Sequence, residues 1–132
     1  MNFPQVNIIT HILLPGENME LQYRDLENSI RIIKLIGTLD ITGTGKIQTI
    51  FAGYCAEDKA RMIVDLSEVD FLSSIGVRLL MLTAKSIGSR GGKMVLLNPI
   101  PEVLHVLEIT GIPAVMPIYS SLEAAETVLL AP

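Results

Sequence analysis

The strongest constraint on the fold is the order of two short apolar segments and the helical pattern between them. Met62 to Leu66 and Met94 to Leu97 each predict a short apolar strand, and Ile75 to about Arg90 repeats apolar side chains with a helical period. Two strands joined through a helix are parallel, because the connection crosses over the sheet. Strands that are apolar throughout are typical of a sheet covered on both faces. This part of the chain therefore predicts an α/β fold.

The segment before Met62 predicts a hairpin followed by a helix. Met19 to Leu26 alternates partly in hydrophobicity, Glu27-Asn28 is a turn, and Ser29 to Gly37 is rich in isoleucine. We expect these residues to form two antiparallel strands. From Ile41 to about Asp58 the apolar residues recur three and four positions apart, which predicts a helix.

The segment after Leu97 predicts a helix, an edge strand and a closing helix. Pro101 to Glu108 has proline in its first turn, as helices often do. Ala114 to Ile118 is expected at the edge of the sheet, because the prolines beside and within it lack a backbone donor. Ser120 to Leu130 closes the chain, with Ser120 and Glu123 spaced as a capping box.

These elements predict one domain with a mostly parallel central sheet of about five strands, an N-terminal hairpin and about four helices. A chain of 132 residues suits a single core. We assign residues 19–132 to this domain and residues 1–18, punctuated by Pro4 and Pro15-Gly16, to an N-terminal extension. Within the extension, Val6 to Leu14 could add an edge strand, pack on a second copy or remain loose.

Composition excludes several classes of function. The net charge of -4 argues against binding to nucleic acid, whose phosphates attract a basic surface. No apolar run approaches ~18 residues, so we expect no membrane span, and the first residues make a poor signal peptide. The only cysteine, Cys55, can form no disulfide within the chain, which fits a reducing cytoplasm, and we expect it in the core. His11 and His105 have no metal-ligand spacing, so we expect neither metal nor cofactor.

Ser73 and Ser74 mark the place where the strand Met62 to Leu66, after a short loop, gives way to a helix. A serine there can be the N-cap, whose oxygen accepts a hydrogen bond from a free N–H of the first turn. It can equally be a modification site, because the helix dipole and the free N–H groups favour negative charge. The spacing alone leaves both roles open. On the outer face of the same helix, Ile75 and Leu82 beside Arg78 weakly favour a docking surface.

Two catalytic or nucleotide-binding alternatives fit the residues poorly. The segment Gly43 to Lys46 suggests a phosphate loop, yet Asp40 and Ile47 occupy positions where a Walker loop needs glycine and a hydroxyl residue. A serine nucleophile would need a nearby base, and nothing ties His105 to Ser74. We therefore expect no enzyme, and nucleotide binding at Gly43 to Lys46 remains the weaker alternative.

From Met19 to Leu130 the chain resembles the STAS domain, which is named for sulfate transporters and anti-sigma factor antagonists. The family pattern appears in five segments in the family's order, namely Gly37 to Asp40, Ile63 to Leu66, Phe71 to Leu80, Gly91 to Leu96 and Leu107 to Gly111. The chain departs from many antagonists at Leu72, where Asp is frequent, and at Ile75, where Gly or Ala is frequent.

The resemblance implies a STAS-like fold and a bacterial anti-sigma factor antagonist. It implies that Ser74 is phosphorylated by the partner, an anti-sigma factor that is a serine kinase, and that a serine phosphatase reverses this. The unmodified protein would bind the kinase and free its sigma factor. We expect partner-binding residues around Ser74, namely Asp40, Thr42, Leu72, Ser73, Ile75, Arg78 and Leu82.

Two further questions stay open at this point. An unphosphorylated STAS scaffold or a transporter-associated interaction domain would need only the fold, with Ser74 as a cap. The sequence is also silent on oligomeric state, a homodimer included.

Overall fold

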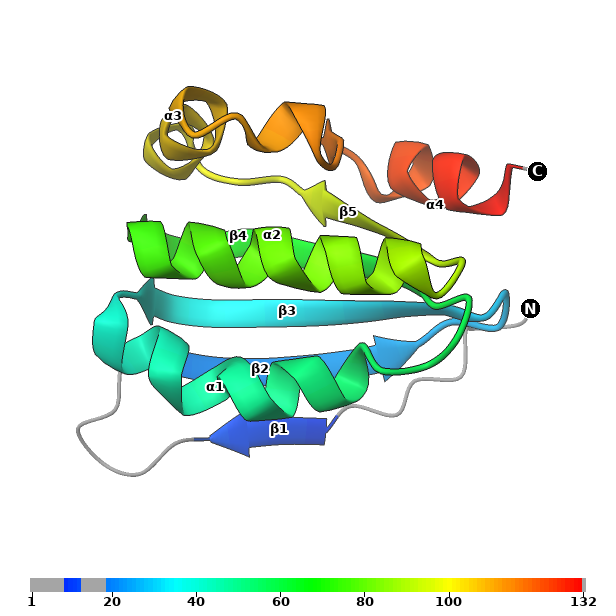
Figure 1. Ribbon diagram of the computed structural model, residues 1–132, viewed down its shortest axis with the longest axis horizontal. Coiled ribbons are helices and arrows are strands. Elements are labelled where there is room, and N and C mark those ends of the chain that lie inside the picture. Colours follow the sequence, from blue (N-terminus) through cyan, green and yellow to red (C-terminus); the bar gives the residue numbers. More distant parts are fainter. Residues whose placement is uncertain (1–8, 13–18, 132) are drawn as a thin grey trace.

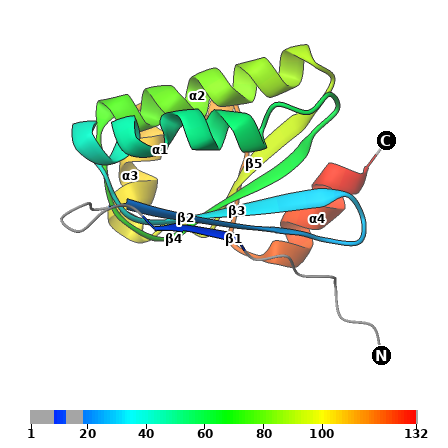
Figure 2. The ribbon, with the colours of Figure 1, turned by 90° about the horizontal axis from the view of Figure 1, so that it is seen from below.

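The computed structural model describes residues 9–12 and 19–131. These residues form a six-stranded sheet in the order β1-β2-β3-β4-β5-β6 (Figure 1), with helices on both faces (Figure 2). The strands are β1 (Ile9–Ile12), β2 (Met19–Asp25), β3 (Ile30–Leu39), β4 (Arg61–Leu72), β5 (Lys93–Leu97) and β6 (Ile118–Tyr119). The helices are α1 (Ile41–Tyr54), α2 (Ser74–Ser89), α3 (Pro101–Ile109) and α4 (Leu122–Leu130), with a short 3-10 helix at Ile112–Ala114.

The pairing of the strands confirms the predicted fold class. The strands β2 and β3 form an antiparallel hairpin, and β3 to β6 pair in parallel. Four of the six strands, β2 to β5, lie where the sequence predicts strands, and each parallel step is spanned by a helix. The sixth strand, β1, pairs antiparallel with β2 at the edge of the sheet.

The described part of the N-terminal extension therefore contributes to the sheet. Of the alternatives left open for Val6 to Leu14, the edge strand is realised at Ile9–Ile12. The other residues of that segment lie outside the described residues. The division of the chain at residue 18 stays a prediction, since one strand of the extension belongs to the same sheet.

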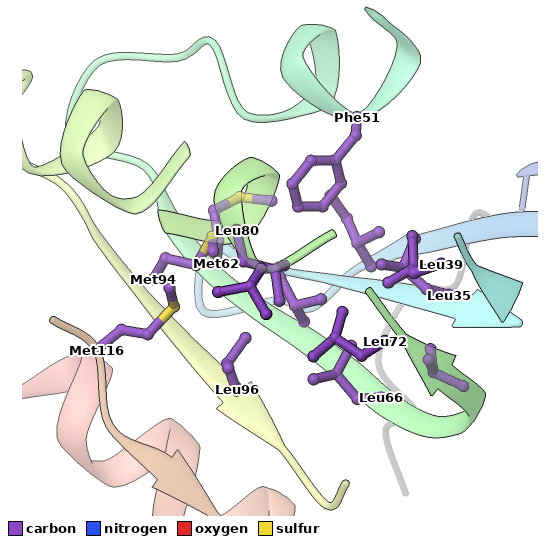
Figure 3. Close-up of a cluster of buried hydrophobic side chains, with 14 of the residues drawn as sticks. Leu35, Leu39, Phe51, Met62, Leu66, Leu72, Leu80, Met94, Leu96 and Met116 are labelled. Carbon is purple, nitrogen blue, oxygen red and sulfur yellow. The ribbon is translucent and has the colours of Figure 1, made fainter. Parts of the chain in front are cut away.

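Helices cover the two faces of the sheet unequally, as Figure 2 shows with α1 and α2 on one side and α4 on the other. The larger core lies under α1, α2 and α3, and Figure 3 shows Phe51 of α1 and Leu80 of α2 gathered with Leu66 and Leu96 of the sheet. The smaller core lies under α4, where Ala125 and Leu129 belong to a cluster with isoleucines of β3 and β4. Burial on both faces explains why these strands are apolar throughout.

The strand β4 is longer than predicted, since it continues through the expected loop to Leu72. The pairing with β3 shifts register twice along this stretch, between Lys34 and Ile36 and again at Gly37, whose φ of 117° few other residues adopt. Each shift places an additional β4 residue against β3, as in a β-bulge. In the second half of β4 the buried residues are therefore Leu66, Val69 and Leu72. This spacing of three differs from the period of two by which a strand is recognised in the sequence.

Three other boundaries differ from the prediction. The predicted strand Ala114 to Ile118 is wrong for most of its length, because Ile112–Ala114 is a 3-10 helix and β6 begins at Ile118. Helix α1 ends at Tyr54, earlier than expected. The predicted capping box is also wrong: the N-cap of α4 is Ser121, whose Oγ accepts a hydrogen bond of 3.1 Å from Ala124 N, so Glu123 lies one position early.

Candidate functional site

The two serines have different roles in the structure. Ser73 is the N-cap of α2: its Oγ donates a 2.6 Å hydrogen bond to the Leu39 carbonyl and accepts a 3.2 Å bond from Gly76 N. The Ser73 backbone N–H also donates to the Leu39 carbonyl, at 2.9 Å. Both hydrogen-bonding capacities of the Ser73 hydroxyl are therefore used by the fold.

Ser74 is the first residue of α2, and it is exposed. The structure gives its hydroxyl no hydrogen bond to any residue in the range 19–131. The sequence left open whether a serine here is the N-cap or a modification site. In the structure Ser73 is the N-cap, and Ser74 presents a hydroxyl that the fold does not use.

The start of α1 lies beside the start of α2 and repeats its capping. Asp40 is the N-cap of α1, and its Oδ1 accepts a 2.7 Å hydrogen bond from Gly43 N. Both first turns contain a buried glycine, Gly43 and Gly76, which permits the helices to pack closely on the ends of β3 and β4. Thr42 lies exposed in the first turn of α1.

Large apolar side chains are exposed around these helix starts. Ile41 is 72% exposed, Phe71 53%, Ile75 41% and Leu82 54%. The sequence predicts Ile75 and Leu82 on this surface, whereas it gives no comparable signal for Ile41 and Phe71. Phe71 can be recognised as an exposed residue only once β4 is known to reach Leu72. Neighbouring residues of a strand face opposite sides, so Phe71 is exposed where Leu72 is buried.

One residue expected at the partner surface does not belong there. Leu72 is 3% exposed and part of the larger core, because β4 extends to it. We therefore remove Leu72 from the expected partner surface. Ser73 is half-buried and contributes through the cap. Asp40, Thr42, Ile75, Arg78 and Leu82 are at least partly exposed at or near the starts of the two helices.

A groove of about 560 Å³ runs between α1 and α2. Figures 1 and 2 show these two helices side by side on the same face of the sheet. The α2 side of the groove includes Ile75, Arg78 and Leu82, so the groove is continuous with the apolar surface beside Ser74. The α1 side includes Thr44, Gln48 and Ala52.

The helix pair carries positive charge on a protein that is acidic as a whole. Neither α1 nor α2 contains Asp or Glu, while they contain Lys46, Arg78 and Lys85. The chain has a net charge of -4, so the negative charge lies elsewhere.

The remaining candidate chemistries find no support in the described residues. Gly43 to Lys46 belong to α1, where Thr44 N donates to the Asp40 carbonyl, so this segment is helix and not a phosphate loop. Among residues 19–131, no cluster of His, Cys, Asp or Glu could hold a metal ion. Cys55 is buried in the larger core, and burial raises its thiol pKa to about 12.

None of the helices in the described ranges is both long enough and apolar enough to cross a lipid bilayer. This finding concerns those helices alone.

Comparison with known proteins identifies the family. The STAS domain model matches residues 24–125. The chain belongs to the STAS domain family. This STAS domain is 30% identical over 101 residues to BtrV of Bordetella bronchiseptica, described as an anti-sigma factor antagonist, with 76% of this chain and 87% of BtrV covered. Antagonists of this family are binding modules and not enzymes.

Solved structures share the fold of this STAS domain. An anti-sigma factor antagonist from Mycobacterium paratuberculosis superposes with a TM-score of 0.78 at 22% identity, covering 90% of this chain and all of the other. The Bacillus cell fate determinant SpoIIAA in its phosphorylated form gives a TM-score of 0.62 at 23% identity, covering 82% of this chain and 98% of that one.

Proposed function

We propose that this STAS domain is an anti-sigma factor antagonist that binds a serine-kinase anti-sigma factor and is released when Ser74 is phosphorylated. The observation that carries the proposal is the division of roles between Ser73, which caps α2, and Ser74, whose exposed hydroxyl is unused. The structure of SpoIIAA has been solved in a phosphorylated form, and a phosphorylated protein of the same fold supports the proposal.

The proposed reaction at Ser74 belongs to the partner. The kinase transfers the γ-phosphoryl group of ATP to Ser74 Oγ, ADP leaves, and the hydroxyl gives up its proton. A serine phosphatase resets the protein by hydrolysing the phosphate ester. These steps take place in the cytoplasm, where ATP and the sigma factor are present.

Charge and apolar contact together explain how the switch would act. The unmodified surface joins the exposed side chains of Ile41, Phe71 and Ile75 to the positive face of α1 and α2. We propose that the partner covers it with apolar side chains surrounded by carboxylates. A phosphoserine carries nearly two negative charges, so it repels those carboxylates and adds a strongly hydrated group to the contact.

The fold should tolerate the phosphate. Ser74 is the first residue of α2 and is exposed, and negative charge is favourable at this end of a helix. The cap on Ser73 stays in place. Phosphorylation is therefore expected to change the docking surface and leave the core unaltered.

Substitution of Ser74 tests the proposal directly. Ser74→Asp should weaken binding to the kinase by about a hundredfold, or ~3 kcal/mol, while stability changes by less than ~0.5 kcal/mol. Ser74→Ala should bind without being switched off. The matched control is Ser120→Asp, which adds the same charge at an exposed position preceding α4.

Mass spectrometry after incubation with the kinase and Mg-ATP completes the test. We expect one phosphate, located on Ser74 and absent from Ser74→Ala. A protein that binds its partner but never gains a phosphate would be an unphosphorylated scaffold, and the switch would be rejected. Unfolding of Ser74→Asp would also reject it.

A further inference from the structure

Arg78 lies one helical turn after Ser74 on α2. Residues four apart in a helix share a face, with Cβ atoms about 5–6 Å from each other. Both side chains are exposed, so neither is held away from the other by burial. The guanidinium of Arg78 is therefore within reach of a group attached to Ser74 Oγ.

Within the ranges that the structure describes, Arg78 makes no ion pair and no side-chain hydrogen bond. Its own helix offers no carboxylate, since α2 contains neither Asp nor Glu. The residues one turn before and after Arg78 are Ser74, Ile75, Met81 and Leu82, all uncharged. Two other arginines differ from Arg78 in this respect: Arg31 is paired with Asp25, and Arg90 donates to the Cys55 carbonyl.

We propose that Arg78 binds the phosphate on Ser74 within the same molecule. The inference rests on the proposed function for the origin of the phosphate. Guanidinium donors form a planar fork that matches two phosphate oxygens, and such charge-assisted bonds are among the strongest in proteins. An (i, i+4) pair of opposite charge also stabilises the first turns of α2.

Pairing between Arg78 and the phosphate gives phosphorylation a second effect on partner binding. Arg78 lines the groove between α1 and α2, beside Ile75 and Leu82, where it is available to a carboxylate of the partner. A phosphate on Ser74 competes for the same guanidinium. Phosphorylation thus adds negative charge and also withdraws a positive side chain from the docking surface.

Arg78 lies much closer to Ser74 than Lys85, the other cationic residue of α2. Lys85 lies eleven residues after Ser74 on the same helix. At 1.5 Å per residue this is about 16 Å along the axis, beyond the reach of a lysine side chain. Lys85 therefore serves as a matched control of equal charge on the same helix.

The test uses the full chain with phosphoserine inserted at position 74 during translation, so that it needs no kinase. Phosphorus NMR follows the second ionisation of the phosphate, whose pKa is ordinarily about 6. We expect this pKa to be about 0.2–0.4 lower in the otherwise wild-type chain than in Arg78→Gln. The Lys85→Gln control should match the wild type, and Arg78→Lys should recover part of the difference.

A second readout observes the arginine itself. The Nε–H resonance of Arg78 should shift when residue 74 is phosphoserine instead of serine, while the backbone resonances of α2 keep their helical pattern. An equal phosphate pKa in wild type and Arg78→Gln, with no shift of the arginine resonance, overturns the proposal. The proposed function fails separately, if no kinase modifies Ser74 although the pair forms in the translated phosphoprotein.

Discussion

Gly76 lies so close to Leu72 that a methyl group added to it would be 2.7 Å from Leu72 Cδ1 and 3.1 Å from the Leu39 carbonyl oxygen. This contact brings the first turn of α2 onto the ends of β3 and β4, and it thereby places Ser74 at the surface. The position of the candidate site therefore depends on residue 76 being glycine, which has no side chain.

Gly76→Ala should destabilise the protein because the methyl group has no space. Forced packing of this kind costs about 1–3 kcal/mol, more than the intrinsic helical gain of alanine. Gly88→Ala is the matched control on the same helix, where a Cβ meets no atom within 4 Å, and it should be neutral or stabilise by up to ~1 kcal/mol. Urea unfolding of both variants measures the difference, and equal stabilities would contradict the packing described.

The neighbouring serines should respond differently to alanine. Ser73→Ala removes the N-cap of α2 and the bond to the Leu39 carbonyl, so the free energy of unfolding should fall by about 1–2 kcal/mol. Ser74→Ala removes an exposed hydroxyl without a described hydrogen bond and should change stability by less than ~0.5 kcal/mol. Thermal and urea unfolding test the pair. A larger loss for Ser74→Ala would reverse the assignment of cap and switch.

Phe71 and Leu72 provide a second pair of neighbours with opposite environments. Leu72→Ala should destabilise the fold by about 2–5 kcal/mol, because Leu72 is buried in the larger core. Phe71→Ala should cost less than ~1 kcal/mol, since about half of that side chain is in water. Under the proposed function it should instead weaken partner binding more than tenfold, as loss of an aromatic anchor does. Calorimetric titration with the partner would contradict this if Phe71→Ala bound normally.

The thiol of Cys55 should be unreactive in the folded protein. Burial raises its pKa to about 12, so almost no thiolate is present at pH 8. Iodoacetamide should therefore label the protein only in denaturant. Because the pKa is higher in the folded state, this group favours folding below about pH 9, and the contribution is lost as the pH rises toward 12. Rapid labelling of the native protein at pH 8 would show that Cys55 is accessible.

Local patterns were sufficient to predict most of the architecture. The hairpin, the parallel crossovers and the four helices follow from periodicity and turn residues that neighbouring positions supply. The same patterns place Ser73 and Ser74 at the start of a helix. They also indicate Ile75 and Leu82 on its outer face, since an i, i+7 spacing is a local property.

Tertiary pairing decided what local patterns could not. The two register shifts between β3 and β4 carry the strand through to Leu72, which buries Leu72 and exposes Phe71. Only the nearby end of β3 distinguishes the serines, because the Leu39 carbonyl engages Ser73 and leaves Ser74 unused. The amino-acid order specifies a serine pair at a helix start, but a contact between strands distant in sequence determines which hydroxyl is free.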